Sequence, residues 1–175
     1  MIVLLPLQLQ YCEAVAEIAK ECLPEHWSLD GIRGVLQYDH NIYYVACDVE
    51  RKESLGYEDG ENTNDYQNTE NGESTVPCRV VGFAGIILAA DEAELLNIAV
   101  TPSFQGRKIG QALLDKMIVS AREKGIRRIL LEVRKSNTLA MDLYYKNQFV
   151  KLGERKNYYS HPKENAVIME RKITE

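Results

Sequence analysis

The sequence predicts a mixed α/β domain, because its apolar residues follow strand-like and helical periods in turn along one chain of 175 residues. Several strand-like runs come before a second half that repeats strand and helix. A chain of this length is typical of one domain and buries roughly 70% of its unfolded surface. We therefore expect a single domain over residues 1–175, with a core that needs no metal or disulfide.

The first half contains two predicted helices among four predicted strands. Residues 11–22 form the first helix, since their apolar side chains recur at helical spacing. Ser28 is a suitable N-cap for the second, short helix. The strands are apolar or alternating runs at residues 2–7, 42–47, 79–88 and 94–100. Gly82 and Gly85 in the third strand indicate a twisted or closely approached backbone.

The second half alternates strand and helix and ends in two strands. Residues 108–123 form a helix, because Ile109, Leu113 and Met117 share one face, and Gly125 is a natural helix stop. The remaining predictions are a strand at 128–133, a helix at 138–146 and strands at 149–158 and 166–172.

Charge is distributed unevenly around a net value of −5. Residues 53–77 carry seven acidic and no basic side chains and few apolar ones, so they cannot bury enough surface to offset the entropy of ordering. We expect a flexible acidic insertion between two strands, or else an acidic arm that recruits a basic partner. Residues 79–175 carry seventeen basic and eleven acidic side chains, which suits an anionic ligand.

The cysteine and histidine positions predict neither a disulfide framework nor a metal site. The four cysteines are Cys12, Cys22, Cys47 and Cys78. They are widely spaced, form no Cys-x-x-Cys pair and have apolar neighbours, so we expect reduced thiols. His26, His40 and His161 lie in polar settings without metal-ligand spacing. The apolar run at 2–5 is too short for a signal or membrane segment, and a cytoplasmic protein is expected.

A strand, a turn and a helix follow one another over residues 97–114. Such a turn presents unpaired backbone N–H groups at a helix N-terminus, where the helix dipole also favours an anion. Arg107 and Lys108 add positive charge. The alternative is an ordinary loop with solvated basic residues, and neither a Gly-x-Gly-x-x-Gly motif nor a P-loop is present.

Two polar residues occupy positions that are unusual for their type. Glu132 lies within an apolar strand, where an unpaired carboxylate is costly, so it must face water or a partner. It is either half of an ion pair with an arginine or a general base. Asn137, Ala140 and Tyr144 share one face of the following helix. A tyrosine at that position is either a core residue or a functional one.

The turn resembles the acetyl-CoA motif of the Gcn5-related N-acetyltransferase superfamily, Gln/Arg-x-x-Gly-x-Gly/Ala. Gln105 and Gly110 match its ends, Lys108 stands where the pattern has its first glycine, and Gly106 lies two positions earlier. Within that superfamily, residues 93–172 resemble the ribosomal-protein-alanine N-acetyltransferases. Further matches lie at 131–134, Ser136, Asn137, Ala140, Leu143, Tyr144, Phe149, 155–159 and 167–169, with a looser match at Trp27 and Ser28.

The resemblance implies a mostly antiparallel twisted sheet of about six to seven strands with about four helices, and acetyl-CoA as co-substrate without a metal. It implies that Glu132 accepts a proton from the amine and that Tyr144 protonates the departing thiolate. The residues implied to bind the cofactor are Ile98, Ala99, Val100, Gln105, Gly106, Arg107, Lys108, Ile109, Gly110, Gln111 and Asn137. Asn157, Tyr158 and Tyr159 precede a polar loop, and they either line the acceptor mouth or pack at an edge of the fold.

The expected function is therefore acetyl transfer to a primary amine, which we take to be the N-terminal α-amine of a ribosomal protein that begins with alanine. One alternative acceptor is a small amine such as a polyamine, an amino acid or an aminoglycoside. A third hypothesis is a non-catalytic module that binds acyl-CoA, because Lys108 replaces the usual glycine. We expect no nucleic-acid or membrane partner, and the oligomeric state is left open.

Overall fold

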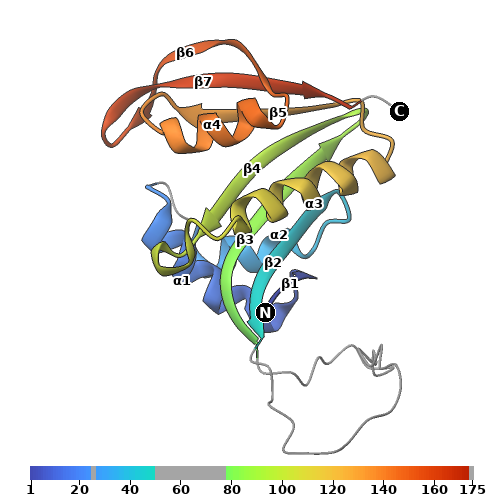
Figure 1. Cartoon of the computed structure of the whole chain (residues 1–175). Coiled ribbons are helices and arrows are strands. Elements are labelled where there is room, and N and C mark those ends of the chain that lie inside the picture. The colour runs from blue at the N-terminus through green and yellow to red at the C-terminus, as the bar shows by residue number, and fades with distance from the viewer. Residues whose placement is uncertain (25–26, 50–77, 174–175) are drawn as a thin grey trace, which may run out of the picture.

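The computed structural model of the chain describes residues 1–24, 27–49 and 78–173, and these form one sheet with helices on both faces (Figure 1). The strands are β1 (Ile2–Pro6), β2 (Asn41–Val49), β3 (Cys78–Ala89), β4 (Glu92–Val100), β5 (Arg128–Arg134), β6 (Val150–Ser160) and β7 (Lys163–Lys172). The helices are α1 (Cys12–Cys22), α2 (Leu29–Val35), α3 (Ile109–Glu123) and α4 (Thr138–Lys146), with 3-10 turns at Leu9–Tyr11 and Pro102–Phe104.

The seven strands of this sheet lie in the order β1-β2-β3-β4-β5-β7-β6, and every pair except β4–β5 is antiparallel. The parallel pairing of β4 with β5 is short and ends at Leu95 opposite Leu131. Both strands continue beyond that point, and they diverge (Figure 1). The predicted mixed, mostly antiparallel sheet is confirmed, and its two halves separate at the centre.

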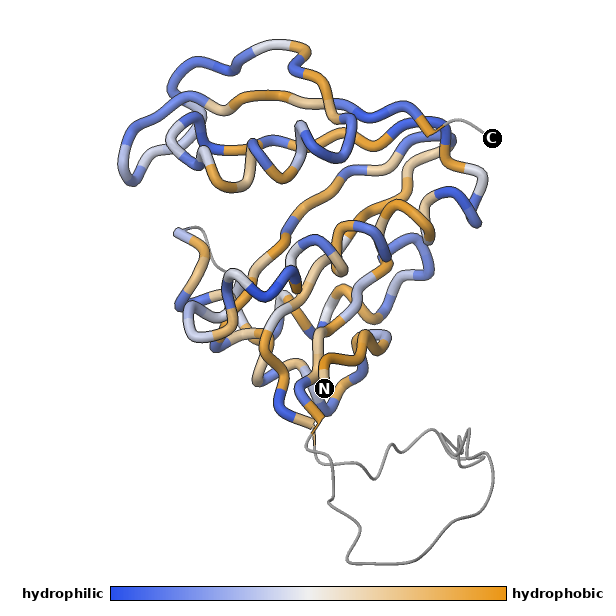
Figure 2. Tube along the Cα trace, viewed as in Figure 1, coloured by the Kyte–Doolittle hydropathy of each residue, from blue (hydrophilic) through white to orange (hydrophobic). Residues whose placement is uncertain are grey.

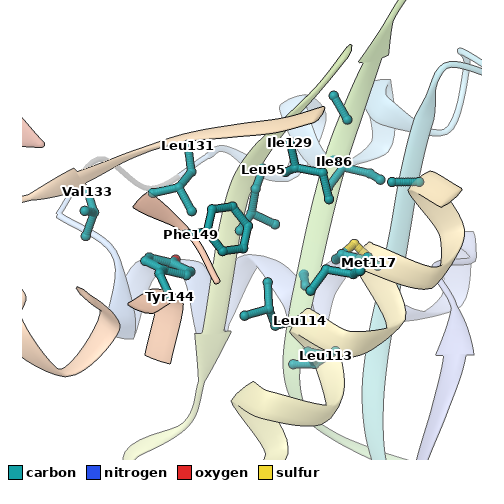
Figure 3. Close-up of a cluster of buried hydrophobic side chains, with 14 of the residues drawn as sticks. Ile86, Leu95, Leu113, Leu114, Met117, Ile129, Leu131, Val133, Tyr144 and Phe149 are labelled. Carbon is teal, nitrogen blue, oxygen red and sulfur yellow. The ribbon is translucent and has the colours of Figure 1, made fainter. Parts of the chain in front are cut away.

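Two hydrophobic clusters hold the helices against opposite faces of the sheet. Leu113 and Met117 of α3 belong to one buried cluster with Ile86 of β3 and with Phe149 (Figure 3). The other cluster joins Val15 of α1 to the opposite face of the sheet. Figure 2 shows the hydrophobic residues of the strands running through the middle of the molecule. Successive side chains of β3 therefore pack into the two clusters on opposite faces, as expected for a buried central strand.

The predicted elements are all present, with small shifts at their ends. Lys108 is the N-cap of α3 and not its first helical residue, because its φ of +61° lies in the left-handed region. The last two strands are longer than predicted, since a hairpin joins them and extends their pairing over polar residues. Ser28 caps α2 as predicted, and its Oγ accepts from the N–H of Gly31.

The prediction of four reduced thiols is wrong, because Cys47 of β2 and Cys78 of β3 form a disulfide. The two strands are antiparallel neighbours, which brings the Cα atoms within 5.4 Å across a sequence separation of 31. Spacing along the chain does not reveal such a long-range pairing. Cys12 and Cys22 are free thiols.

The predicted insertion at 53–77 lies outside the described residues, as does His26. His40 and His161 are exposed, which agrees with their polar neighbours in the sequence. No helix in the described part of the chain combines the length and the apolar character needed to cross a bilayer.

Candidate active site

A cleft of about 500 Å³ opens where β4 and β5 part. Its lining includes Cys22 from the end of α1, Ile98 from β4 and Glu132 from β5. Tyr144 of α4 and Tyr158 of β6 complete the wall. Residues that are far apart in the sequence thus meet where the pairing of β4 with β5 ends.

A β-bulge shapes the β4 side of the cleft. Gly85 pairs with Asn97 and Ile86 pairs with Leu95, so Leu96 has no partner in β3. An extra residue of this kind bends a strand and re-aims its side chains. As a result, consecutive residues of β4 from Glu94 to Ile98 line the cleft.

The turn before α3 offers an anion site at one end of β4. Lys108 and Gly106 have φ values of +61° and +75°, and a Cβ placed on Gly106 would meet nothing within 4 Å. The N–H groups of the first helical turn have no intrahelical acceptor, and the helix dipole adds partial positive charge. The Arg107 guanidinium lies 4.7 Å from the centroid of Phe104, which holds it at the turn. These groups fit the phosphates of a coenzyme A molecule.

Some of the predicted cofactor residues line the cleft, whereas others can offer a ligand only their main-chain groups. Ile98 and Asn137 line the cleft. Ala99 and Ile109 are buried in the core, so each can offer only its backbone. Nε2 of Gln111 donates to both Asp115 and Asn147, which leaves only its main chain for a ligand.

The remaining turn residues support the end of β4. Nε2 of Gln105 donates to the carbonyl oxygen of Val100 at 2.9 Å, and Sγ of Cys22 lies 3.5 Å from the same oxygen. A Cβ on Gly110 would lie 3.9 Å from Leu143, so α3 and α4 approach each other at this glycine. Gln105 therefore has a structural bond that the sequence does not reveal.

Glu132 carries the ion pair that was one of its two predicted alternatives. Its Oε1 lies 3.1 Å from Nη1 of Arg155, and its side chain is 17% exposed. The Tyr158 hydroxyl donates to the same carboxylate, and this hydrogen bond raises the pKa of Tyr158 above its ordinary value. Because the carboxylate also lines the cleft, the ion pair leaves it within reach of a ligand.

Tyr144 is a core residue and a cleft residue at the same time. Its side chain is 8% exposed, and its ring packs against Phe149 with centroids 5.6 Å apart (Figure 3). Burial raises the pKa of Tyr144 to about 12. The hydroxyl therefore stays protonated near neutral pH. Asn137 caps α4 by accepting from the N–H of Ala140 at 3.1 Å, and the helix that carries Tyr144 begins at this cap.

Of the three residues predicted at the acceptor mouth, two line the cleft. Tyr158 and Tyr159 do so, with ring centroids 5.0 Å apart in an edge-on arrangement. Asn157 does not; it has a φ of +54°, and its N–H donates to Oδ1 of Asn165. The guanidinium of Arg134 lies 4.1 Å from the Tyr159 ring centroid. Asn157 thus shapes the strand that presents the two tyrosines.

Sequence reasoning missed several cleft residues. Glu94, Leu23 and Trp27 line the wall, and Arg155 reaches Glu132. Trp27 lies in the looser match of the first half to the acetyltransferase superfamily, so that match could have indicated a cleft residue. Arg155 faces Glu132 only through strand pairing across β7. Among the described residues, no group of three or more His, Cys, Asp or Glu side chains is placed to hold a metal ion.

The fold and the cleft define a class of mixed α/β domain, in which two central parallel strands splay beside the N-terminus of a helix. The chain belongs to the Acetyltransferase (GNAT) family, which residues 12–149 match. The resemblance drawn from the turn motif is confirmed.

Named relatives are similar to part of this chain. The ribosomal protein bS18-alanine N-acetyltransferase of Haemophilus influenzae is 46% identical over 94 residues, which are 52% of this chain and 64% of that protein. The chain thus spans less than two thirds of that relative. The protein of the same name from Escherichia coli K12 is 38% identical over 112 residues, which are 63% of this chain and 72% of that one. A crystal structure of the Escherichia coli ribosomal-protein-S18-alanine N-acetyltransferase has a TM-score of 0.75 at 26% identity, covering 100% of this chain and 96% of that one.

Proposed function

We propose that this chain transfers an acetyl group from acetyl-CoA to the N-terminal α-amine of a protein, and that this protein is a ribosomal protein beginning with alanine. The observation that carries the proposal is the meeting of Glu132 and Tyr144, from two different elements, in one cleft beside an anion-binding turn. The family supports acetyl transfer, and the names of the similar proteins support the acceptor.

The turn and the splayed end of β4 hold the co-substrate in this proposal. The amides of the first turn of α3, together with Arg107 and Lys108, bind the phosphates. The backbone of β4 near Ile98 has no strand partner on the side facing β5, so it can pair with an extended amide-bearing arm. Acetyl-CoA supplies the activated acetyl thioester.

Glu132 prepares the acceptor in this proposal. An α-ammonium group has a pKa of about 8 and must lose a proton before its nitrogen can attack the thioester carbon. The Glu132 carboxylate lines the cleft and accepts that proton directly or through a water molecule. Its position on a central strand keeps it in place while the acceptor enters.

Tyr144 protonates the departing thiolate in this proposal. Its pKa of about 12 keeps the phenol protonated at neutral pH, and its buried ring packs against Phe149. A rigid donor of this kind needs no reorganisation during the reaction. No covalent enzyme intermediate is required, so neither Cys12 nor Cys22 is needed as a nucleophile.

Steady-state kinetics with acetyl-CoA and a peptide that begins with alanine tests the proposal. Wild type releases CoA, and Glu132→Gln and Tyr144→Phe each lower kcat by about 10²–10⁴-fold, the usual contribution of a general acid or base. The matched control is Tyr145→Phe, at the exposed neighbouring tyrosine, which leaves kcat unchanged. Full turnover by a Glu132→Gln, Tyr144→Phe double variant would refute these roles.

A small cationic amine is the second candidate acceptor. Glu94 and Glu132 both present carboxylates to the cleft, and Tyr158 lies beside Glu132. This arrangement would attract a polyamine as well as a peptide N-terminus. A panel of amines decides between them, since a kcat/KM for peptide far below that for small amines would favour the second candidate. For either acceptor we expect a cytoplasmic reaction that uses no metal.

A further inference from the structure

The guanidinium group of Arg155 forms an ion pair with the carboxylate of Glu132, which we assign as the general base. Nη1 of Arg155 lies 3.1 Å from Oε1 of Glu132. The same guanidinium lies 5.5 Å from the centroid of the Tyr158 ring, and the Tyr158 hydroxyl donates to Glu132. A carboxylate next to an aromatic face is a favourable site for a cation, through charge and through the ring quadrupole. The described structure therefore contains a cation site whose occupant is part of the chain.

An irregularity in β6 brings the parts of this site together. Residues three apart in a regular strand face opposite sides of a sheet. Arg155 pairs with Ala166 and Tyr159 pairs with Glu164, so β6 carries two more residues than β7 between these pairs. The positive φ of Asn157 lies within this stretch. The resulting bulge brings both the Arg155 guanidinium and the Tyr158 hydroxyl to Glu132.

The two partners of the ion pair differ in their freedom to move. The Arg155 side chain is 58% exposed, whereas that of Glu132 is 17% exposed. An ion pair with a partner this exposed shifts an equilibrium by no more than about fivefold, because water solvates the arginine nearly as well. The guanidinium can therefore leave at small cost, while the carboxylate stays in the wall of the cleft.

We propose that Arg155 is an internal stand-in for the ammonium group of the acceptor, which displaces it from Glu132 and Tyr158 on binding. The nature of the incoming cation rests on the proposed function, whereas the cation site itself rests on the contacts above. Arg155 is then a positioning residue that sets the affinity for the acceptor. It keeps the carboxylate paired until the acceptor arrives, and it takes no part in proton transfer.

The kinetic test replaces Arg155 and separates KM from kcat. Arg155→Ala lowers the KM for the alanine peptide by up to about fivefold and leaves kcat unchanged, since a competitor has been removed. Arg155→Lys keeps a cation on the site and stays close to wild type. The matched control is Arg127→Ala, because Arg127 is also exposed and paired, at 3.9 Å with Asp91, and neither residue lines the cleft. A raised peptide KM or a large fall in kcat for Arg155→Ala would overturn the inference.

A titration with guanidinium chloride tests the site without any turnover. In Arg155→Ala the free guanidinium ion shifts the ring resonances of Tyr158 in NMR spectra, and it competes with the peptide in kinetics. Wild type responds weakly, because its own guanidinium holds the site, and sodium chloride at equal ionic strength controls for screening. Adding Glu132→Gln to Arg155→Ala abolishes the shift.

The two tests keep this inference distinct from the proposed function. If wild type acetylates no amine but guanidinium binds Arg155→Ala and not its Glu132→Gln derivative, the proposed function fails and the cation site stands. If guanidinium does not bind Arg155→Ala, the inference is wrong even for an active acetyltransferase.

Discussion

The ring of Tyr43 covers Gly85, its cross-strand partner in β3. A Cβ atom placed on Gly85 would lie 2.0 Å from Cε1 of Tyr43, a distance that no side chain can tolerate. Gly85 is also the last residue before the register shift that produces the β4 bulge. This pair therefore ties the core beneath α1 to the strand that forms one wall of the cleft.

Gly85→Ala is expected to destabilise the protein by about 1–3 kcal/mol, because the new methyl group displaces a buried ring. Urea unfolding followed by circular dichroism measures the loss. Gly34→Ala is the matched control, since a Cβ there meets nothing within 4 Å and the residue lies inside α2. It should raise stability by about 0.5–1 kcal/mol through helix propensity. Equal effects of the two substitutions would contradict the role assigned to Tyr43.

Lys108 adopts a left-handed conformation that costs a non-glycine residue roughly 1–2 kcal/mol. Lys108→Gly relieves this strain, whereas Lys108→Ala removes the same charge and keeps the strain. We expect the free energy of unfolding of the glycine variant to exceed that of the alanine variant by about 1 kcal/mol. The glycine variant should therefore unfold at a higher urea concentration. If alanine proved the more stable substitution, the backbone at the head of α3 would not be strained.

The disulfide between Cys47 and Cys78 closes a loop with a sequence separation of 31. Cross-linking a loop of this length stabilises a protein by about 3–4 kcal/mol in the chain-entropy model. A Cys47→Ala, Cys78→Ala double variant should lose this amount, and a reductant should lower the stability of wild type but not of the variant. Cys22→Ala, at a free thiol, keeps the response to reductant. Wild type that is indifferent to reductant would refute the pairing.

The raised pKa of Tyr144 makes the stability of the fold depend on alkaline pH. Its pKa is about 12 in the folded protein against 10.0 for an ordinary tyrosine. The folded state therefore holds the proton more tightly. This difference in pKa stabilises the folded state by about 3 kcal/mol. The stabilisation is complete below pH about 10 and is lost as the pH rises to about 12.

Tyr144→Phe should remove this loss of stability, measured as the change in unfolding free energy between those two pH values. The exposed Tyr145 offers the control, because Tyr145→Phe keeps the wild-type slope. A slope that is unchanged in Tyr144→Phe would show that Tyr144 titrates as an ordinary tyrosine does.

Local patterns were sufficient to predict most of the fold. The apolar face of α3 and the Ser28 cap follow from side chains near one another in the sequence, and both are confirmed. The close approach expected at Gly82 is also confirmed, since a Cβ there would lie 2.8 Å from the carbonyl oxygen of Ala99. Such features depend on the residues themselves and on their immediate neighbours.

Features that depend on strand pairing could not be predicted from the same patterns. The splay after Leu95 and Leu131 requires the register of two strands that an entire helix separates. Contact between Arg155 and Glu132 requires a third strand to lie between them. The disulfide likewise joins two strands whose cysteines have a sequence separation of 31. The sequence therefore predicted residues that line the cleft, such as Glu132 and Tyr144, but not the side chains that they contact, and the roles of these residues stay predictions.

The most direct test of the central claim is to locate the acetyl group on the product. Wild type is incubated with acetyl-CoA and a peptide that begins with alanine and also contains an internal lysine, and the product is sequenced by tandem mass spectrometry. We predict one acetyl group on the α-nitrogen of the alanine, with none formed by the Glu132→Gln, Tyr144→Phe double variant. Acetylation of the lysine alone, or an unmodified peptide beside rapid acetylation of a polyamine, would contradict the proposed function.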